Sequence, residues 1–439
     1  MLKRKIYTKL VEWKSTSDKK CLVIKGARQV GKTYVVRKFG KAEYKSFIEI
    51  NFLRQPALKQ IFNNELSGEE IFKRITAYIP NANILPGNTL LFLDEIQKCP
   101  NARTALKFLA EDGRIDVIAS GSLLGLSYGQ DADPEVGEIS SIPVGYEIPL
   151  MMYSLDFEEF LWANGYDSDT ITYLYSYYEK REKCPFEIND KFEQLVREFI
   201  VVGGMPEVVS DFITHKDFNR VHAIQTRLVN DYEDDIAQHA KGVEKVKVRR
   251  CYDSIPNQLA RENKKFKYSE VEKKSTAKKY GDSIQWLIDA NMAYSCVNVL
   301  EPILPLRYNE KENEFKIYIN DTGLLMSLFG KETKLALLNN TLKGFAKVGI
   351  YENFVAESLI KKGYSLHYYK PNDDSELEFV IEKEGQVIPI EVKAGNSATK
   401  SLNRFIDNFS PAIAYKIIDG NIGYMEPKLS IPHYMVMFL

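Results

Sequence analysis

Residues 26–33 read GARQVGKT, in which two glycines separated by four residues are followed by Lys-Thr. The apolar run at residues 21–24 predicts a buried strand before this stretch, and residues 33–39 predict a helix after it. Glycines allow the backbone to wrap closely around phosphate oxygens, and a helix N-terminus favours negative charge. The stretch therefore predicts a phosphate-binding loop formed by Gly26, Ala27, Arg28, Gln29, Val30, Gly31, Lys32 and Thr33.

Two side chains of this loop have specific expected roles in binding ATP. Lys32 would reach the β- and γ-phosphates, and the Thr33 hydroxyl would hold Mg²⁺. The alternative is an ordinary glycine-containing turn between a strand and a helix. The flanking strand and helix favour the phosphate-binding interpretation.

A second motif, TLLFLDEIQKCP at residues 89–100, contains an apolar run that predicts a buried parallel strand ending in Asp94-Glu95. Asp94 would support Mg²⁺ and Glu95 would polarise the attacking water, which predicts hydrolysis and makes Glu95 and Lys32 the candidate catalytic residues. The alternative is an acidic helix N-cap. After a third expected strand at residues 116–119, Ser120 or Ser122 could contact the γ-phosphate or the water.

No arginine finger is evident from the sequence. Arg103 and Arg114 are candidates, but no feature distinguishes them. A finger supplied in trans would require a homo-oligomer or a partner.

Length and composition limit the class of protein. At roughly 150 residues per domain, 439 residues predict about three domains. A net charge of −1 gives no global reason to expect nucleic acid or an anionic membrane as partner. The five cysteines are scattered without CxxC spacing, and no signal peptide or long apolar run is present. We therefore expect a reduced, cytoplasmic protein that does not bind a membrane.

The motifs GARQVGKT, LFLDEIQKCP, ASGSLLG and FIVVGGMPEVV, with the later YINDTGLL and SELEFVIEKEGQVIPIEVKAG, resemble one family over nearly the whole chain. It is the AAA-family ATPases of bacteria and archaea that carry a C-terminal domain of unknown function. The resemblance implies an α/β fold with a parallel-sheet P-loop ATPase core at residues 1–165 and a helical lid or connector at 166–240. A winged-helix-like domain at 241–335 and a C-terminal α/β domain similar to PD-(D/E)XK nucleases at 336–439 would follow.

The middle of the chain leaves two alternatives open. Gly203-Gly204 could be a hinge or a helix packing corner. Residues 241–280 contain 13 Lys or Arg and 5 Asp or Glu, a local charge of 13 − 5 = +8. Such a segment could bind double-stranded DNA, or it could be a solvated surface that contacts a protein or only packs.

The C-terminal segment predicts a hairpin with its turn at residues 384–385. Glu391 and Lys393 would share one face of its second strand, and Glu378 would lie on the first, which is the carboxylate and lysine set that a metal-dependent nuclease needs. Glu352 or Glu357 could add a ligand to this possible second metal site. The family usually has Asp at position 378, so a nuclease-like fold without cleavage, or Glu–Lys pairs on a solvent-exposed face, are the alternatives.

These features predict an Mg²⁺-dependent ATPase coupled to an output module that meets DNA or a protein. An ATP-gated regulatory protein with little turnover and an ATP-gated DNA nuclease are the other two hypotheses.

Overall fold

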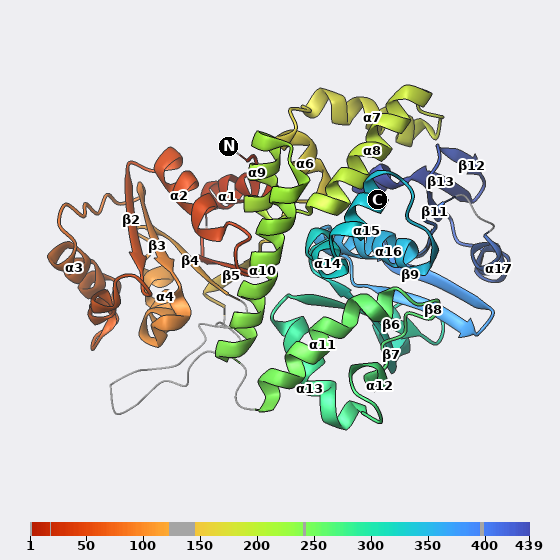
Figure 1. Ribbon diagram of the computed structural model, residues 1–439. Helices are drawn as coiled ribbons and strands as arrows, with labels where there is room; N and C mark the ends of the chain where they lie inside the picture. The colour runs from red at the N-terminus through yellow and green to blue at the C-terminus, as the bar shows by residue number, and fades with distance from the viewer. Residues whose placement is uncertain (1, 18, 123–144, 240–242, 396–398) are drawn as a thin grey trace. The chain divides into compact units, whose positions relative to one another are not determined.

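A computed structural model describes residues 2–17, 19–122, 145–239, 243–395 and 399–439 (Figure 1). The chain divides into two compact units. The N-terminal unit is Lys3–Ser154, and the C-terminal unit is Leu155–Leu439 together with residues 1 and 2.

The N-terminal unit contains a five-stranded, fully parallel sheet with the order β2-β3-β4-β1-β5. Its elements are α1 (Lys5–Ser15), β1 (Cys21–Gly26), α2 (Lys32–Glu43), β2 (Ser46–Asn51), η1 (Pro56–Phe62), α3 (Gly68–Tyr78), β3 (Thr89–Asp94), η2 (Ile96–Lys98), α4 (Pro100–Asp112), β4 (Asp116–Ser122) and β5 (Glu147–Met151). The strands expected at residues 21–24, 90–93 and 116–119 are present as β1, β3 and β4.

Helices cover both faces of this sheet, which is why its central strands β1, β3 and β4 contain apolar runs without alternation. Alternate residues such as Val23 and Leu91 pack against α3 and α4 in one core. The strand residues that point to the other face of the sheet are also buried. On that face Phe92 stacks on Phe47, with 6.4 Å between the ring centroids. Because parallel strands end at a common edge, the chain segments that follow β1, β3 and β4 meet there.

The C-terminal unit begins with helices and ends in a mixed sheet. The first part comprises α6 (Phe157–Ala163), α7 (Ser168–Lys180), α8 (Phe186–Val202), α9 (Pro206–His215), α10 (Phe218–His239), α11 (Val243–Leu259), α12 (Tyr268–Val271) and α13 (Ala277–Asp289). The second part comprises β6 (Ala293–Val299), η4 (Leu306–Asn309), β7 (Glu310–Ile319), α14 (Thr322–Phe329), α15 (Lys331–Leu338), α16 (Gly344–Lys361), β8 (His367–Asn372), β9 (Ser375–Lys383), β10 (Gln386–Val392), α17 (Lys400–Phe409), β11 (Ala414–Ile418), β12 (Gly423–Met425), β13 (Lys428–Pro432) and η5 (His433–Phe438).

One eight-stranded sheet runs through this unit in the order β12-β13-β11-β10-β9-β8-β6-β7. The hairpin β6–β7 joins the later strands because β6 pairs with β8 in parallel. The segments at 241–335 and 336–439 therefore share one sheet, as Figure 1 shows.

The glycine pair after α8 is a packing corner. A Cβ at Gly203 would lie 2.7 Å from Cα of Gly323, and a Cβ at Gly204 would lie 2.0 Å from the carbonyl oxygen of Leu155. The Gly204 N–H donates to Asp321 at 2.8 Å. These contacts favour the packing corner over the hinge that the sequence also allowed.

We expect Gly204→Ala to lower the free energy of unfolding by about 2 kcal/mol or more, because the backbone of Leu155 cannot move aside as a side chain could. Gly281→Ala is the matched control, since Gly281 lies inside α13 with open space around it and alanine favours a helix. This control should gain roughly 0.5–1 kcal/mol. Thermal unfolding of both variants checks the prediction, and equal stability of Gly204→Ala and wild type would contradict it.

Candidate functional site

The GARQVGKT loop connects β1 to α2, and geometry requires both of its glycines. A Cβ at Gly26 would lie 2.1 Å from the carbonyl oxygen of Met152, which follows β5. Gly31 has a φ of 94°, in the left-handed region that favours glycine, and Gln29 shares that region with a φ of 62°. The loop is thus a tight backbone cradle directly before a helix N-terminus, the arrangement that binds phosphate.

Lys32 is the first residue of α2 and folds back over the loop. Its Nζ donates to the carbonyl oxygens of Gly26 at 3.0 Å and Ala27 at 2.7 Å. Arg4, which the sequence did not suggest, donates to the carbonyl oxygens of Val30 at 3.0 Å and Tyr153 at 2.7 Å. Lys32 is therefore held at the phosphate-binding loop. Arg4, which directly precedes α1, holds the same loop through Val30.

Asp94, at the carboxyl end of β3, is the centre of a hydrogen-bond cluster and is 2% exposed. It accepts from Thr33 Oγ1 at 3.0 Å, from Asn51 Nδ2 at 2.8 Å and from Ser120 Oγ. Ser120 reaches it because β4 lies between β1 and β3. The structure therefore brings the candidate residues Thr33, Asp94 and Ser120 together and adds Asn51, from the end of β2.

Glu95 follows Asp94 in a left-handed conformation, with a φ of 56°. Its side chain does not cap the short helix η2, so the alternative of an acidic N-cap is wrong for Glu95. Its Oε2 accepts from Gln97 Nε2 at 2.6 Å, and the residue is partly exposed. A non-glycine residue in this strained backbone conformation is typical of functional sites, which agrees with the position of Glu95 directly after Asp94.

The two arginine candidates lie away from this cluster. Arg103 is paired with Glu147 at 2.7 Å, at the start of β5, and Arg114 is paired with Asp112 at 2.7 Å, before the start of β4. Both positions are at the amino-terminal edge of the sheet, whereas Asp94 is at the carboxyl edge. Ser122 is buried at the end of β4, beside Gly26 in the strand register.

In the C-terminal unit, Glu378 on β9 and Glu391 on β10 lie on neighbouring antiparallel strands. Lys393 Nζ is 3.0 Å from Glu391 and 3.9 Å from Glu378. Glu378 also accepts from the Val392 N–H at 3.0 Å. The exposed fractions of Glu378 and Glu391 are 9% and 1%, so the alternative of a solvent-exposed face is wrong.

Further charges surround these residues, and three lysines offset part of the charge of four glutamates. Glu352 on α16 pairs with Lys264 at 3.0 Å and lies 3.8 Å from Lys316, which in turn pairs with Glu376 at 2.5 Å. We call this set the acidic cluster: Glu352, Glu376, Glu378 and Glu391, with Lys264, Lys316 and Lys393. Glu357 is engaged elsewhere, by Thr322 at 2.8 Å and by Lys361.

The acidic cluster predicts a pH dependence of stability. Burial raises the pKa of Glu378 to about 7, against the opposing effect of Lys393. The folded chain then holds a proton that the unfolded chain releases near pH 4.3, so stability falls as the pH rises from about 4.5 to 7 and above. We expect Glu378→Gln to remove this decline and to be more stable than wild type at pH 8 by about 1–3 kcal/mol.

Thermal unfolding of wild type and Glu378→Gln between pH 5 and pH 8 checks the direction of the predicted change in stability with pH. The control is Glu384→Gln at the exposed hairpin turn, which should follow the wild-type pH profile. A parallel pH profile for wild type and Glu378→Gln would contradict a raised pKa.

Acids from other elements neutralise three cations of the basic segment, which lowers its net charge from +8 to 8 − 3 = +5. Arg249 pairs with Glu233 at 2.6 Å, Lys265 with Glu314 at 3.1 Å, and Lys264 is buried in the acidic cluster. Among the described residues, exposed lysines without an ion pair are Lys245, Lys267, Lys273, Lys274 and Lys278. Lys241 lies outside the described residues.

Within the described ranges, no three His, Cys, Asp or Glu side chains are arranged to hold a metal ion. No helix in the part of the chain that the structure describes is long and apolar enough to cross a membrane.

Comparison with protein families identifies three matching segments. Residues 18–161 match the model of a family described as AAA domain. Residues 193–335 and 348–429 match two families that are each described as a domain of unknown function. With the loop geometry above, the first match defines an AAA-type P-loop domain with a parallel-sheet core, and the predicted α/β fold class is confirmed.

Three relatives by sequence are each described as an uncharacterized protein. A protein of Haemophilus influenzae is 23% identical over 323 residues, which are 72% of this chain and 70% of the relative. Proteins of Mycobacterium bovis and Mycobacterium tuberculosis are 36% identical over 91 residues, which are 20% of this chain and 19% of the length of each relative.

Among solved structures, the Walker-type ATPase PABY2304 of Pyrococcus abyssi has a TM-score of 0.44 and 14% identity, covering 75% of this chain and 96% of that one. The ORC1 protein of Aeropyrum pernix, solved in complex with DNA, has a TM-score of 0.29 and 12% identity over 77% and 93% of the two chains. AMPPCP-bound DnaA of Aquifex aeolicus has a TM-score of 0.27 and 14% identity over 65% and 86%. TM-scores this low carry no functional inference.

Proposed function

We propose that this protein is an Mg²⁺-dependent ATPase whose N-terminal unit binds and hydrolyses ATP. The observation that carries the proposal is the cluster at Asp94, which joins the phosphate loop through Thr33 to the neighbouring strand through Ser120. The glycine-dependent cradle at Gly26 and Gly31 supports the fit to a polyphosphate. Thr33 and Asp94 would hold Mg²⁺, which would screen the charge of the phosphates.

Each side chain has a proposed role. Lys32 would exchange its contacts with the Gly26 and Ala27 carbonyl oxygens for the phosphate oxygens. Glu95, partly exposed beside Asp94, would orient and polarise the attacking water. Ser120 would sense the γ-phosphate through its bond to Asp94. An arginine finger would come from a second copy or a partner, because Arg103 and Arg114 lie at the opposite edge of the sheet.

We propose that the C-terminal unit is the output module. The order α11, α12, α13, β6 and β7 supports a winged-helix-like part, and the strands β8–β11 around α17 support a nuclease-like part. After the ion pairs with Glu233, Glu314 and Glu352, the basic segment keeps a net charge of 8 − 3 = +5, so double-stranded DNA and a protein surface both stay candidate partners.

We further propose that the acidic cluster maintains the fold and does not cleave DNA. Lys393 bridges Glu378 and Glu391, the two carboxylates that a metal would need, and Lys316 and Lys264 engage Glu376 and Glu352. The Lys393 ammonium group faces both carboxylates, and its positive charge would repel a divalent cation between them. The five buried free cysteines support a reducing compartment such as the cytoplasm.

The experiment that tests the function is ATP hydrolysis by the full chain with Mg²⁺, with and without double-stranded DNA. Turnover that is indifferent to DNA would support a protein partner for the output module, and turnover that rises with DNA would support the nucleic-acid alternative. ATP binding without turnover would favour the regulatory switch instead. Absence of both binding and turnover would contradict the assignment.

A further inference from the structure

Lys334 on α15 is a buried lysine without a compensating acid. It is 2% exposed, and among the described residues no carboxylate lies within ion-pair distance of its Nζ. Its contacts are the side-chain oxygen of Gln225, to which it donates, and Nδ1 of His222 at 3.2 Å. An ammonium group has three N–H donors, so one donor and the whole charge lack a partner here.

Burial alone lowers the pKa of Lys334 to about 7. Burying this amine costs free energy of folding, and an apolar residue at the same position would avoid that cost. The buried amine therefore needs either a structural explanation or a ligand.

Lys334 lines a cavity of about 320 Å³ beside the start of α10. Its wall contains two further lysines, Lys216 and Lys331, and one acid, Asp217. The Asp217 carboxylate accepts from the Asn219 N–H at 2.8 Å, as a helix cap does. Asn219 and the apolar residues Phe218, Leu335 and Leu338 complete the wall, so the cavity combines a positive charge with a partly apolar surface.

We propose that this cavity binds the phosphate group of a small phosphorylated molecule, with Lys334 as its buried counter-charge. The α15 helix begins at Lys331 without a side-chain cap, which adds positive potential on the same side. The volume is larger than a phosphate ion needs and lies within the range of small-molecule sites. Lys331, exposed at the rim, would steer the anion, and Lys334 would take up a proton as the anion enters.

The competing explanation is structural. Gln225, the partner of Lys334, also donates to the carbonyl oxygens of Val201 at 2.9 Å and Val202 at 2.8 Å, at the end of α8. Lys334 could serve only to orient this amide. That role requires no ligand and is insensitive to phosphate.

His222 gives a local readout that separates the two explanations. Burial, Lys334 and Lys331 all lower the pKa of its imidazole. Lys216 and Asp217 are the other charged residues that line the cavity. An anion in the cavity would offset the lysines, so the His222 pKa should rise and its ring resonances should shift.

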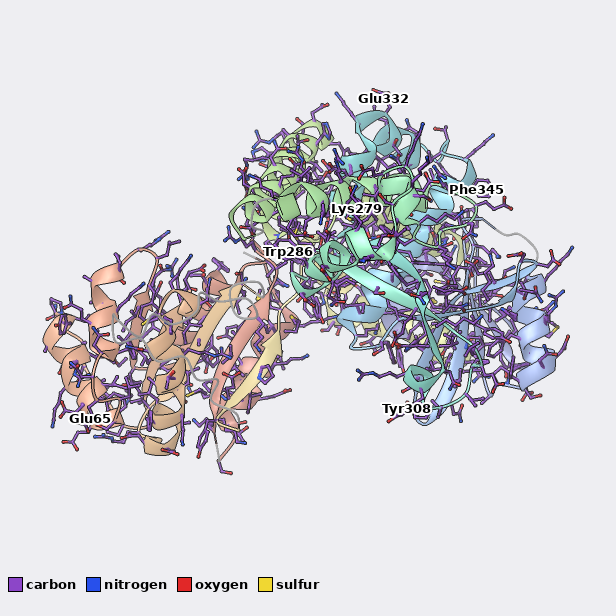
Figure 2. All side chains as sticks on the ribbon, turned by 90° about the horizontal axis from the view of Figure 1, so that it is seen from below. Glu65, Lys279, Trp286, Tyr308, Glu332 and Phe345 are labelled. Carbon is purple, nitrogen blue, oxygen red and sulfur yellow. The ribbon has the colours of Figure 1, made fainter. Side chains whose placement is uncertain are left out.

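The experiment titrates the full chain with inorganic phosphate while the histidine ring resonances are followed by NMR, with His222→Gln to assign the signal. We expect a saturable shift of His222 with a millimolar Kd. Lys334→Met should weaken this binding at least about tenfold, and Lys331→Gln roughly threefold. Glu332→Gln is the control, because Glu332 projects from the same turn of α15 into solvent, as labelled in Figure 2.

The titration is repeated in Lys32→Ala, so that phosphate bound at the GARQVGKT loop is not counted. A His222 shift that persists there supports a separate site, even if ATP hydrolysis fails. No saturable shift, or a shift that both lysine variants leave unchanged, would overturn the proposal in favour of the structural role. If Lys334→Met does not fold, Lys331→Gln decides alone, since Lys331 is exposed and its replacement leaves the core intact.

Discussion

Replacing Lys32 by alanine is expected to reduce ATP hydrolysis at least about 100-fold and to weaken ATP binding. The ammonium group begins α2 directly at the cradle, and the carbonyl oxygens of Gly26 and Ala27 hold it there before any phosphate arrives. Alanine keeps the helix start but removes the ammonium group that would contact the β- and γ-phosphates. Phosphate release and ATP binding, measured side by side, check the result.

Lys41→Ala is the matched control for this variant. Lys41 is exposed near the other end of α2, so its loss removes the same charge from the same helix without touching the loop. It should hydrolyse ATP like wild type, and both variants should have wild-type thermal stability within roughly 0.5 kcal/mol. If Lys32→Ala bound and hydrolysed ATP as well as Lys41→Ala does, the loop would not be a nucleotide site.

The sequence was sufficient to predict the ATPase fold because its determinants are local. The glycines, Lys32 and Thr33 act within eight residues, and the strand ending at Asp94 is apolar throughout because helices bury both of its faces. Parallel pairing then brings the ends of β1, β3 and β4 to one edge. Local pattern and sheet geometry thus lead to the same site.

The residues that were missed act over long separations in the chain. Asn51 ends β2 with a polar side chain directly after Ile50, and that weak signal could have placed it beside Asp94. Arg4 has no comparable signal, since its contact with Val30 spans 26 residues. Long-range partners of this kind depend on tertiary packing, which a local pattern does not encode.

Charge was the least reliable guide to the C-terminal unit. The basic segment reads as an exposed surface, yet Lys264 from it is buried against Glu352, 88 residues away in the chain (352 − 264). Lys316 is likewise fully buried, between Glu352 and Glu376. Net charge along a segment does not reveal which acids will fold against it, so the DNA-binding interpretation of residues 241–280 stays a prediction.

Glu95→Gln is expected to leave ATP binding intact and to lower turnover by about 100-fold or more. Glutamine has the same shape as glutamate and can still bond to Gln97, but it cannot take a proton from water. Asp94 and its bonds to Thr33, Asn51 and Ser120 are unchanged by this substitution, so the Mg²⁺ and phosphate contacts should persist.

Binding titrations with ATP and single-turnover hydrolysis separate these two effects. Gln97→Ala is the control, because it removes the partner of Glu95 and keeps the carboxylate, and it should retain most of the turnover. Turnover of Glu95→Gln at the wild-type rate would show that the base lies elsewhere. The expected pair of results, binding lost in Lys32→Ala and chemistry lost in Glu95→Gln, assigns the two motifs to separate steps, which neither variant does alone.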